Sequence, residues 1–512
     1  MEGRPGKPGR PSAVFMGVPV LVQSQMVLSG HQSLLATRSM TVNADRKVCK
    51  IMSNSQNSGS GISTVGTGLI ALSVALTLVA CRPPLEAPSI SSGASSGWSL
   101  VDSTRYDQDA NNSEYYAVAV LTSGDVVVGG VVPTKGFAWP GLIRAFSPDS
   151  QMQWEQRYVS GKNRSDSVQA LAACPDGGFV AVGMTELMQP KKDSDVAFIA
   201  KYTADGKQVW RNTSAEPRTN AYSSVAVASD GSIFVVGNAH SPQHIVGLPD
   251  GVYDAGIAKY DSDGKLLWQK VFSSKKGDDE FIGVAATRDG GVVVVGNTSA
   301  LNSVFPREGD KDGTDALILQ FSPDGAIQWE RLLPGASLGQ PAVGNDGNIV
   351  VPVWVTAEWL SWDFSLPDGT SNASLVAKFS TSGKLLWASP CGSTGQTNCG
   401  SVALDSEDNV FAVGQYAHPI VGSSDPNQMM CDGSLIKMNG STGASVWSKT
   451  YGGSKDTYFN SVVVANDGGI VIIGATMSSD GDFPIGGNDV WGQTNMSRAS
   501  MVVKLSPDGA LR

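Results

Sequence analysis

Closely spaced aspartates are the residues of this 512-residue chain that could most readily hold a metal ion. Asp310, Asp312 and Asp315 fall within six positions around a glycine. Carboxylate oxygens spaced in this way suit a hard cation such as calcium. An Asp also recurs just before an apolar run at Asp254 and Asp432, and a repeated Asp often caps a turn by accepting local amides. We expect the capping role, with calcium as the alternative and no other cofactor.

Histidine and nucleophile chemistry has little support. His240 and His244 have the spacing of a metal pair on a helix, but Pro242 lies between them and the segment predicts a loop. His418 is isolated in the sequence. No G-x-S-x-G nucleophile elbow and no Ser, His and Asp order stands out in the sequence, and no cysteine pair has zinc spacing.

Aromatic side chains in the expected long loops are the strongest indication of binding. Flat rings stack on sugars or anchor protein partners. Packing beneath their own loops is the alternative. The candidate ligand-binding residues are Trp354, Trp359, Trp362 and Trp491, and Trp139, Phe364 and Phe483 lie in similar segments.

These residues must be positioned by an internal repeat, which is marked by tryptophans 56 to 61 residues apart. A regular repeat fixes the architecture before any local prediction. The comb consists of Trp98, Trp154, Trp210, Trp268, Trp329, Trp387 and Trp447. All but the first follow a turn residue by four positions, and the last such turn, at Gly509, has no Trp after it. We therefore expect the segment near Trp98 to supply the strand that the last repeat lacks.

The repeat at residues 222–272 shows the expected strands. Two Asp-Gly pairs, at Asp230 and Asp263, each lie between short apolar runs rich in Val and Ile, which predicts two hairpins. The sequence thus predicts an all-β, seven-bladed β-propeller of four-stranded antiparallel blades over residues 98–512. Residues 501–505 should pair with a strand at residues 98–102. Both tight turns of each blade should share one rim, and the long loops should share the other.

The N-terminal residues 1–80 predict a signal-peptide region. Residues 69–80 form an apolar segment of signal-peptide length that ends at Cys81. The segment is preceded by many residues, so Met52 or Met40 is the expected start. Residues 81–97 are rich in Pro, Ser and Gly and predict a flexible tether. A secreted protein or an uncleaved anchor is the alternative.

Three other cysteines and a set of lysines that recur in the repeat are predicted to have structural roles. Cys391 and Cys399 bracket a short loop, and an oxidising compartment would favour their disulfide. Cys174 is expected in the core. Lysines recurring in the third strand of the repeat are expected to be solvated; they are Lys201, Lys259, Lys378, Lys437 and Lys504.

The repeat elements resemble those of bacterial β-propeller-repeat lipoproteins. They include Val293-Val294-Val295-Gly296, the turn from Asp263 to Trp268, and Tyr451-Gly452-Gly453. Leu78-Val79-Ala80-Cys81 resembles a lipobox, which implies lipidation of Cys81. The turn ending in Trp447 is similar to the tryptophan-docking element of quinoprotein (PQQ-like) propellers, which implies Trp packing between blades. A propeller lipoprotein that helps assemble outer-membrane proteins belongs to the same broad superfamily.

Charge and resemblance together give the predicted function. The net charge is −10 and no basic stripe occurs, so nucleic-acid binding is not expected. We expect a monomeric, lipid-anchored protein of the bacterial cell envelope, at the outer membrane or cell surface. It would bind a protein or glycan through its long-loop face and meet the membrane only through the lipid. The alternative function is an enzyme, a hydrolase or lyase, acting on extracellular glycans.

Overall fold

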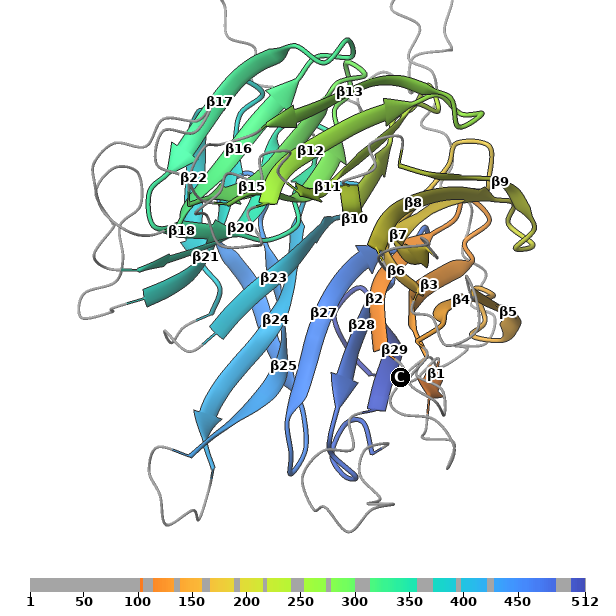
Figure 1. The fold of residues 1–512 in the computed structure, drawn as a ribbon. Helices are drawn as coiled ribbons and strands as arrows, with labels where there is room; N and C mark the ends of the chain where they lie inside the picture. The colour runs from red at the N-terminus through yellow and green to blue at the C-terminus, as the bar shows by residue number, and fades with distance from the viewer. Residues whose placement is uncertain are drawn as a thin grey trace, which may run out of the picture. The chain divides into compact units, whose positions relative to one another are not determined.

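The computed structural model is an all-β, seven-bladed propeller of antiparallel sheets, as predicted (Figure 1). The chain divides into two compact units, residues 1–89 and 90–512, and the second contains everything described below. The structure describes residues 102–104, 114–132, 139–158, 166–187, 194–214, 219–240, 253–272, 278–299, 314–356, 372–392, 397–420, 428–484 and 499–511. These described residues contain no helix of the length and apolarity that crossing a membrane requires.

Each blade consists of strands a to d in chain order. Blade one is β2 (Glu114–Val120), β3 (Val126–Val131), β4 (Gly141–Phe146) and β5 (Met152–Tyr158). Blade two is β6 (Asp166–Ala173), β7 (Phe179–Leu187), β8 (Ser194–Tyr202) and β9 (Gln208–Thr213). Blade three is β10 (Thr219–Val227), β11 (Ile233–His240), β12 (Tyr253–Tyr260) and β13 (Leu266–Phe272). Blade four is β14 (Asp279–Ala286), β15 (Val292–Thr298), β16 (Asp315–Phe321) and β17 (Ile327–Leu333).

The remaining blades include one irregular sheet and the closing strand. Blade five is β18 (Ala336–Leu338), β19 (Ala342–Val343), β20 (Ile349–Thr356), β21 (Asn372–Phe379) and β22 (Leu385–Pro390). Blade six is β23 (Thr397–Leu404), β24 (Val410–Pro419), β25 (Met429–Met438) and β26 (Ser445–Tyr451). Blade seven is β27 (Thr457–Val464), β28 (Ile470–Thr476) and β29 (Ala499–Leu505), completed by β1 (Asp102–Thr104).

The N-terminal strand closes the ring, which confirms the split last blade. β1 pairs antiparallel with β29, with Asp102 opposite Val502. The described strand overlaps the expected segment only at Asp102, and Trp98 lies outside the described residues. Apolar residues of blade seven also pack against blade one, where Val471 and Ile473 join Val118 in one cluster.

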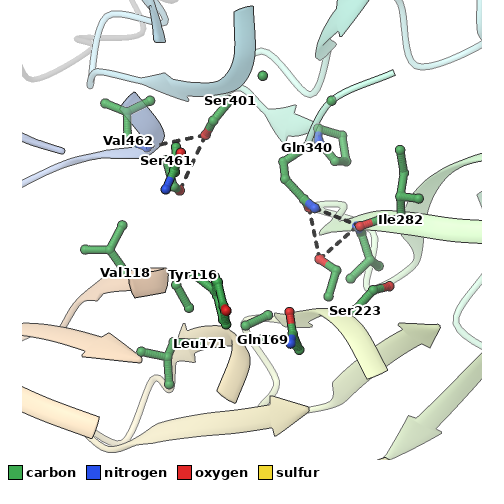
Figure 2. A pocket seen from close by; sticks show the side chains of 18 of the residues that line it. Tyr116, Val118, Gln169, Leu171, Ser223, Ile282, Gln340, Ser401, Ser461 and Val462 are labelled. Atoms are coloured by element: carbon green, nitrogen blue, oxygen red, sulfur yellow. Dashed lines mark hydrogen bonds between the residues drawn. The ribbon is translucent and has the colours of Figure 1, made fainter. Parts of the chain in front are cut away.

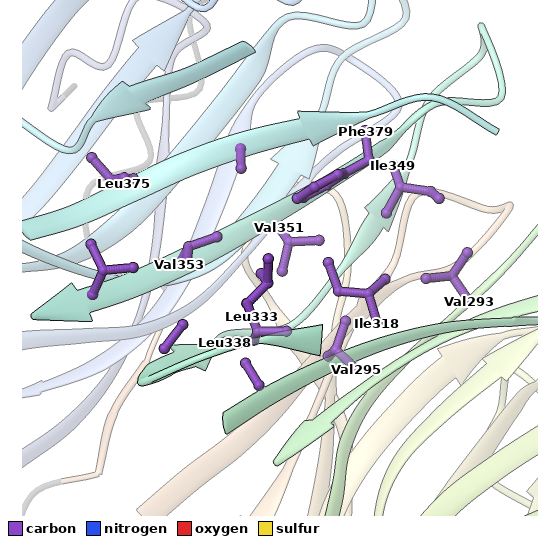
Figure 3. Packing of buried hydrophobic residues seen from close by; sticks show 14 of the residues in the cluster. Val293, Val295, Ile318, Leu333, Leu338, Ile349, Val351, Val353, Leu375 and Phe379 are labelled. Carbon is purple, nitrogen blue, oxygen red and sulfur yellow. The ribbon is translucent and has the colours of Figure 1, made fainter. Parts of the chain in front are cut away.

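The hydrophobic core is divided among the interfaces between blades. The described core residues form seven clusters, one at each junction around the ring. Figure 3 shows the junction of blades four and five, where Ile318 faces Val351 and Val353. Second strands such as β28 are buried along their whole length because both of their faces are covered. This explains why these strands read as continuous Val and Ile runs rather than alternating ones.

The comb tryptophans of blades one to six each contact the following blade. Trp210 donates its indole N–H to Ser262 O in the third-to-fourth-strand turn of the following blade, at 3.1 Å. Its ring covers Gly264, where the φ of 83° favours glycine and where any Cβ would lie only 2.7 Å from the indole. The same contact recurs for Trp154, Trp268, Trp329 and Trp387, with N–O distances of 2.9 to 3.1 Å. The predicted Trp packing is therefore confirmed.

Four of the five strand lysines are buried and Lys437 is half-buried, so the prediction that they are solvated was wrong. Lys378 is 3% exposed. Its ammonium pairs with Asp346 of its own blade at 2.6 Å and donates to Gly440 O of the next blade at 2.8 Å. Lys201 pairs with Asp176 in the same way, and this hydrogen bond holds the pKa of Asp176 below its ordinary value. The third strands are covered on both faces, so a charge there requires a close partner.

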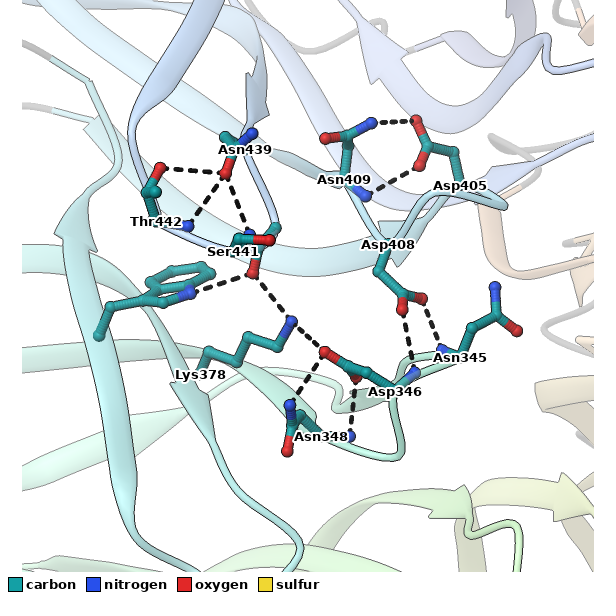
Figure 4. A network of polar contacts seen from close by, with 12 residues as sticks. Asn345, Asp346, Asn348, Lys378, Asp405, Asp408, Asn409, Asn439, Ser441 and Thr442 are labelled. Atoms are coloured by element: carbon teal, nitrogen blue, oxygen red, sulfur yellow. Dashed lines mark hydrogen bonds and ion pairs between the residues drawn. The ribbon is translucent and has the colours of Figure 1, made fainter. Parts of the chain in front are cut away.

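Polar contacts also link the first-to-second-strand turns of neighbouring blades (Figure 4). Asp408 takes the positive φ of 62° that Gly occupies in the other such turns. Its carboxylate accepts the backbone amides of Asn345 and Asp346 at 2.5 and 3.0 Å. These two hydrogen bonds compensate for the strained backbone at Asp408. Because these turns contact the same lysines as the other tight turns, both kinds of turn share one rim, as predicted.

Cys391 and Cys399 come together at the junction of blades five and six. Both are buried in one apolar cluster and are present as free thiols. Burial, together with the adjacent Cys391 thiol, raises the pKa of Cys399. Ser374 holds both segments, accepting the Cys391 amide on its carbonyl and the Cys399 amide on its hydroxyl. The disulfide stays a prediction. Cys174 lies in the core as expected.

Replacing Trp268 should separate the stability that its ring packing contributes from the stability that its hydrogen bond to the next blade contributes. Trp268→Ala should lower the free energy of unfolding by about 3–5 kcal/mol, since a large packed ring is lost. Trp268→Phe keeps a ring over the neighbouring turn and loses the bond to Pro323 O, which should cost about 1 kcal/mol. Urea unfolding measures both values. Leu267→Ala, on the same strand and 48% exposed, is the control; equal losses for all three variants would refute the docking role.

The cysteine pair should form a disulfide in protein produced under oxidising conditions. Closing this short loop should add about 2–3 kcal/mol to the free energy of unfolding. The measurement is thiol titration of denatured, unreduced protein, with the double variant Cys391→Ala, Cys399→Ala as the control. Identical thiol counts are expected for the two proteins. If the wild-type protein shows two more free thiols than the double variant, the disulfide does not form.

Candidate functional site

The long-loop rim collects the exposed large apolar side chains that do not lie on outer strands. Trp139, Tyr253, Trp354 and Met429 are 37 to 48% exposed and all flank second-to-third-strand loops. The other described side chains of this kind lie on fourth strands; they are Met152, Val209, Leu267, Val271, Ile327, Leu386 and Val446. Trp354 lies in β20 opposite Ser374 of β21, close to the segment that carries Cys391.

Two of the other predicted site residues can be located. Asp315, the first residue of β16, is 3% exposed and accepts the amide of Gly335, 20 positions along the chain, at 2.9 Å, so its role as a local turn cap stays a prediction. Phe483 is buried and packs against Tyr451 and Phe459, so this loop aromatic belongs to the core. Trp359, Trp362, Trp491, Asp310, Asp312 and Cys81 lie outside the described residues, as do His244 and the side chain of His240.

A histidine–carboxylate pair lies on the same rim. His418 Nε2 lies 3.2 Å from Asp432 Oδ2, and the His418 ring stacks on Tyr416 with centroids 5.7 Å apart. Burial raises the pKa of Asp432; His418 opposes this, and the nearby Asp482 and Asp456 add to it. Such a pair can exchange a proton. In the part of the chain that the structure describes, no group of three or more His, Cys, Asp or Glu side chains could hold a metal.

Sequence reasoning singled out His418 and Asp432 separately but missed the pair, because its members come from different strands, β24 and β25, that are brought together only by pairing. It also missed a β-bulge in the first strand of each regular blade. In blade three the register shifts between Tyr222 and Ser224, which turns Ser223 toward the ring axis. The repeated glycine makes the bulge feasible: a Cβ on Gly237 would lie 2.1 Å from Ala221 O. The Val-Val-Val-Gly element was visible in the sequence and could have located every bulge.

Blade five lacks this glycine and its first strand is broken. Val353 occupies the position of Gly237, opposite Leu338. The chain then leaves the sheet at Gly339–Pro341 before pairing resumes at Ala342. The excursion carries Gln340 to the ring axis, where its amide donates to Ile282 O at 2.7 Å and its carbonyl accepts from Ser224. Blade five therefore departs from the repeat at its inner edge.

Comparisons with known proteins agree with this fold. The PQQ_2 family, described as outer membrane protein assembly factor BamB, matches residues 140–428. An uncharacterized WD repeat-containing protein, L264, of Acanthamoeba polyphaga mimivirus is 26% identical over 172 residues, which are 29% of this chain and only 12% of that protein.

Two solved structures are similar in fold alone. The quinohemoprotein alcohol dehydrogenase of Comamonas testosteroni aligns with a TM-score of 0.37 and 10% identity, over 81% of this chain and 77% of that one. A polysaccharide lyase of family PL25, an ulvan lyase, aligns with a TM-score of 0.42 and 9% identity, over 73% and 93%. The family match covers more than half of the chain, and the chain therefore belongs to the PQQ_2 family of propellers, described as outer membrane protein assembly factor BamB.

Proposed function

We propose that this chain is a binding or scaffold protein of the bacterial cell envelope, held by a lipid on Cys81, which engages a protein partner through its long-loop rim. The observation that carries the proposal is the position of the exposed rings. Trp139 and Trp354 are 40% and 48% exposed beside long loops. Large rings at a solvent-facing rim stabilise contacts with a partner more than they stabilise the free protein.

The opposite rim is less suited to a partner because its polar groups already serve the ring. The carbonyls of its turns accept from tryptophans and lysines, as Gly440 O does from Trp387 and Lys378. The family description, an outer membrane protein assembly factor, makes a protein of that assembly process the first partner to test. A glycan is the other class of partner that stacked rings suit.

An enzyme acting on extracellular glycans is the second candidate function. One feature favours it: the contact of His418 with Asp432, whose pKa is raised by burial, on the rim where a ligand would dock. A carboxyl group with a raised pKa can serve as a general acid. The scaffold proposal ranks first because exposed aromatic rings lie on blades one and five as well, whereas the histidine–carboxylate pair is confined to blade six.

Truncating the loop tryptophans should weaken partner binding and leave the fold intact. Trp354→Ala, Trp359→Ala and Trp362→Ala should each weaken binding roughly thirtyfold, since an interface Trp contributes on the order of 2 kcal/mol. Binding is measured against envelope proteins captured by the wild-type chain, and the melting temperature is measured for each variant. Leu386→Ala, at 47% exposure in the same blade, is the matched control and should bind normally. A large fall in melting temperature for the loop variants would show that the rings are core and would refute this site.

Lipid anchoring should depend on Cys81. Cys81→Ser removes the only thiol that a lipobox at residues 78–81 could present for acylation. We expect loss of radiolabelled palmitate incorporation and a changed distribution between membrane and soluble fractions. Cys174→Ser, a change at a buried core cysteine, controls for nonspecific effects of losing a thiol. Unchanged lipid incorporation in the Cys81→Ser protein would exclude the anchor.

A further inference from the structure

The first strands of the blades line a cavity of about 450 Å³ on the ring axis (Figure 2). Each regular blade contributes the residue at its β-bulge, and blade five contributes Gln340 instead. The bulge residues are Tyr116, Gln169, Ser223, Ile282, Gly400 and Asn460. The cavity therefore carries a different group on each blade, although the ring that builds it is regular.

Hydrogen-bonding side chains of the described lining come from six of the seven blades, and three of the bulge residues among them are neighbours around the ring. Asn460, Tyr116 and Gln169 come from blades seven, one and two, which are consecutive in the closed ring. Blade six leaves a gap beside them, since a Cβ on Gly400 would meet nothing within 4 Å. Gln340 lies next to this gap, and its bonds to Ile282 O and Ser224 fix the orientation of its carboxamide. The side chains of Gln340, Tyr116 and Gln169 are thus already held by hydrogen bonds within the protein.

The lining of the cavity is neutral. Among the described residues that line it, none is Asp, Glu, Lys, Arg or His. Burial and the hydrogen bond to Glu114 raise the pKa of Tyr116, so its hydroxyl remains protonated at neutral pH. An ion would lose its hydration here without gaining a counter-charge. Apolar side chains such as Val118, Leu171 and Val462 lie between the polar groups.

A ligand that suits this lining has several hydroxyl groups, apolar C–H surfaces and no charge. Carboxamides both donate and accept, so they can bind neighbouring hydroxyls, while the valine and leucine side chains contact the C–H surfaces. The volume falls within the range of about 300–1,000 Å³ that is typical of small-molecule sites. We propose that the axial cavity binds a neutral sugar of mono- or disaccharide size, seated in the gap at Gly400 against Asn460, Tyr116 and Gln169. This site is independent of the partner-binding rim.

Sugar binding to the full chain tests this proposal. The neutral probes are glucose, galactose, rhamnose, N-acetylglucosamine and maltose, and the charged probes are glucuronate and glucose 6-phosphate. Saturation-transfer NMR detects binding and calorimetry gives Kd. We expect at least one neutral sugar to bind, with each charged probe at least about tenfold weaker. The absence of binding by every neutral sugar, or equal binding by the charged probes, would overturn the proposal.

Filling the gap tests its location. Gly400→Phe places a ring in open space and should weaken the binding of the same sugar at least about tenfold without lowering the melting temperature. Val446→Phe adds the same ring at a position that is 56% exposed on an outer strand, and it should leave Kd unchanged. Should Gly400→Phe fail to fold, the pair Gln169→Leu and Asn460→Leu removes the polar contacts instead and should give the same loss. Unchanged Kd in a folded cavity variant would refute the site.

Discussion

In the described part of the ring, a backbone carbonyl shared by two donors joins neighbouring blades at three junctions. Ser262 O accepts the indole N–H of Trp210 and lies 3.3 Å from the ammonium of Lys201, both from the preceding blade. Pro323 O and Gly440 O are shared in the same way. Each of these carbonyls thus accepts from the tryptophan on the outer strand of a blade and from the lysine on the third strand of the same blade. Because both donors come from one blade and the acceptor from the next, the contact sets the spacing between sheets.

This arrangement makes the two rims of the ring chemically different. The tight-turn rim holds the shared carbonyls, the lysine–aspartate pairs and the bridge from Asp408 to Asn345, so its polar groups are largely satisfied within the protein. The long-loop rim carries the exposed rings of Trp139 and Trp354 and the His418–Asp432 pair. A chain of repeats can vary this second rim at low cost, since the contacts that close the ring lie elsewhere.

The fold could be predicted from the sequence because its determinants are local. The Asp-Gly turns and the comb from Trp154 to Trp447 predict hairpins, blade number and ring closure. The burial of Lys378 could not be predicted, because its partners Asp346 and Gly440 belong to a distant turn and to the next blade. The same holds for His418 and Asp432. Both examples depend on pairing between segments, which composition and spacing within one segment do not show.

Blade five shows how a departure from the repeat at one strand can alter two surfaces together. On β20, Val353 replaces the glycine that lets a first strand bulge, since a Cβ in the regular blades would lie 1.7 to 2.1 Å from a carbonyl. The first strand therefore breaks and delivers Gln340 to the axial cavity. The next residue, Trp354, is 48% exposed at the long-loop rim. The break in the first strand and the exposed ring thus depend on adjacent positions of β20, whose sequence shapes both the cavity wall and the long-loop rim.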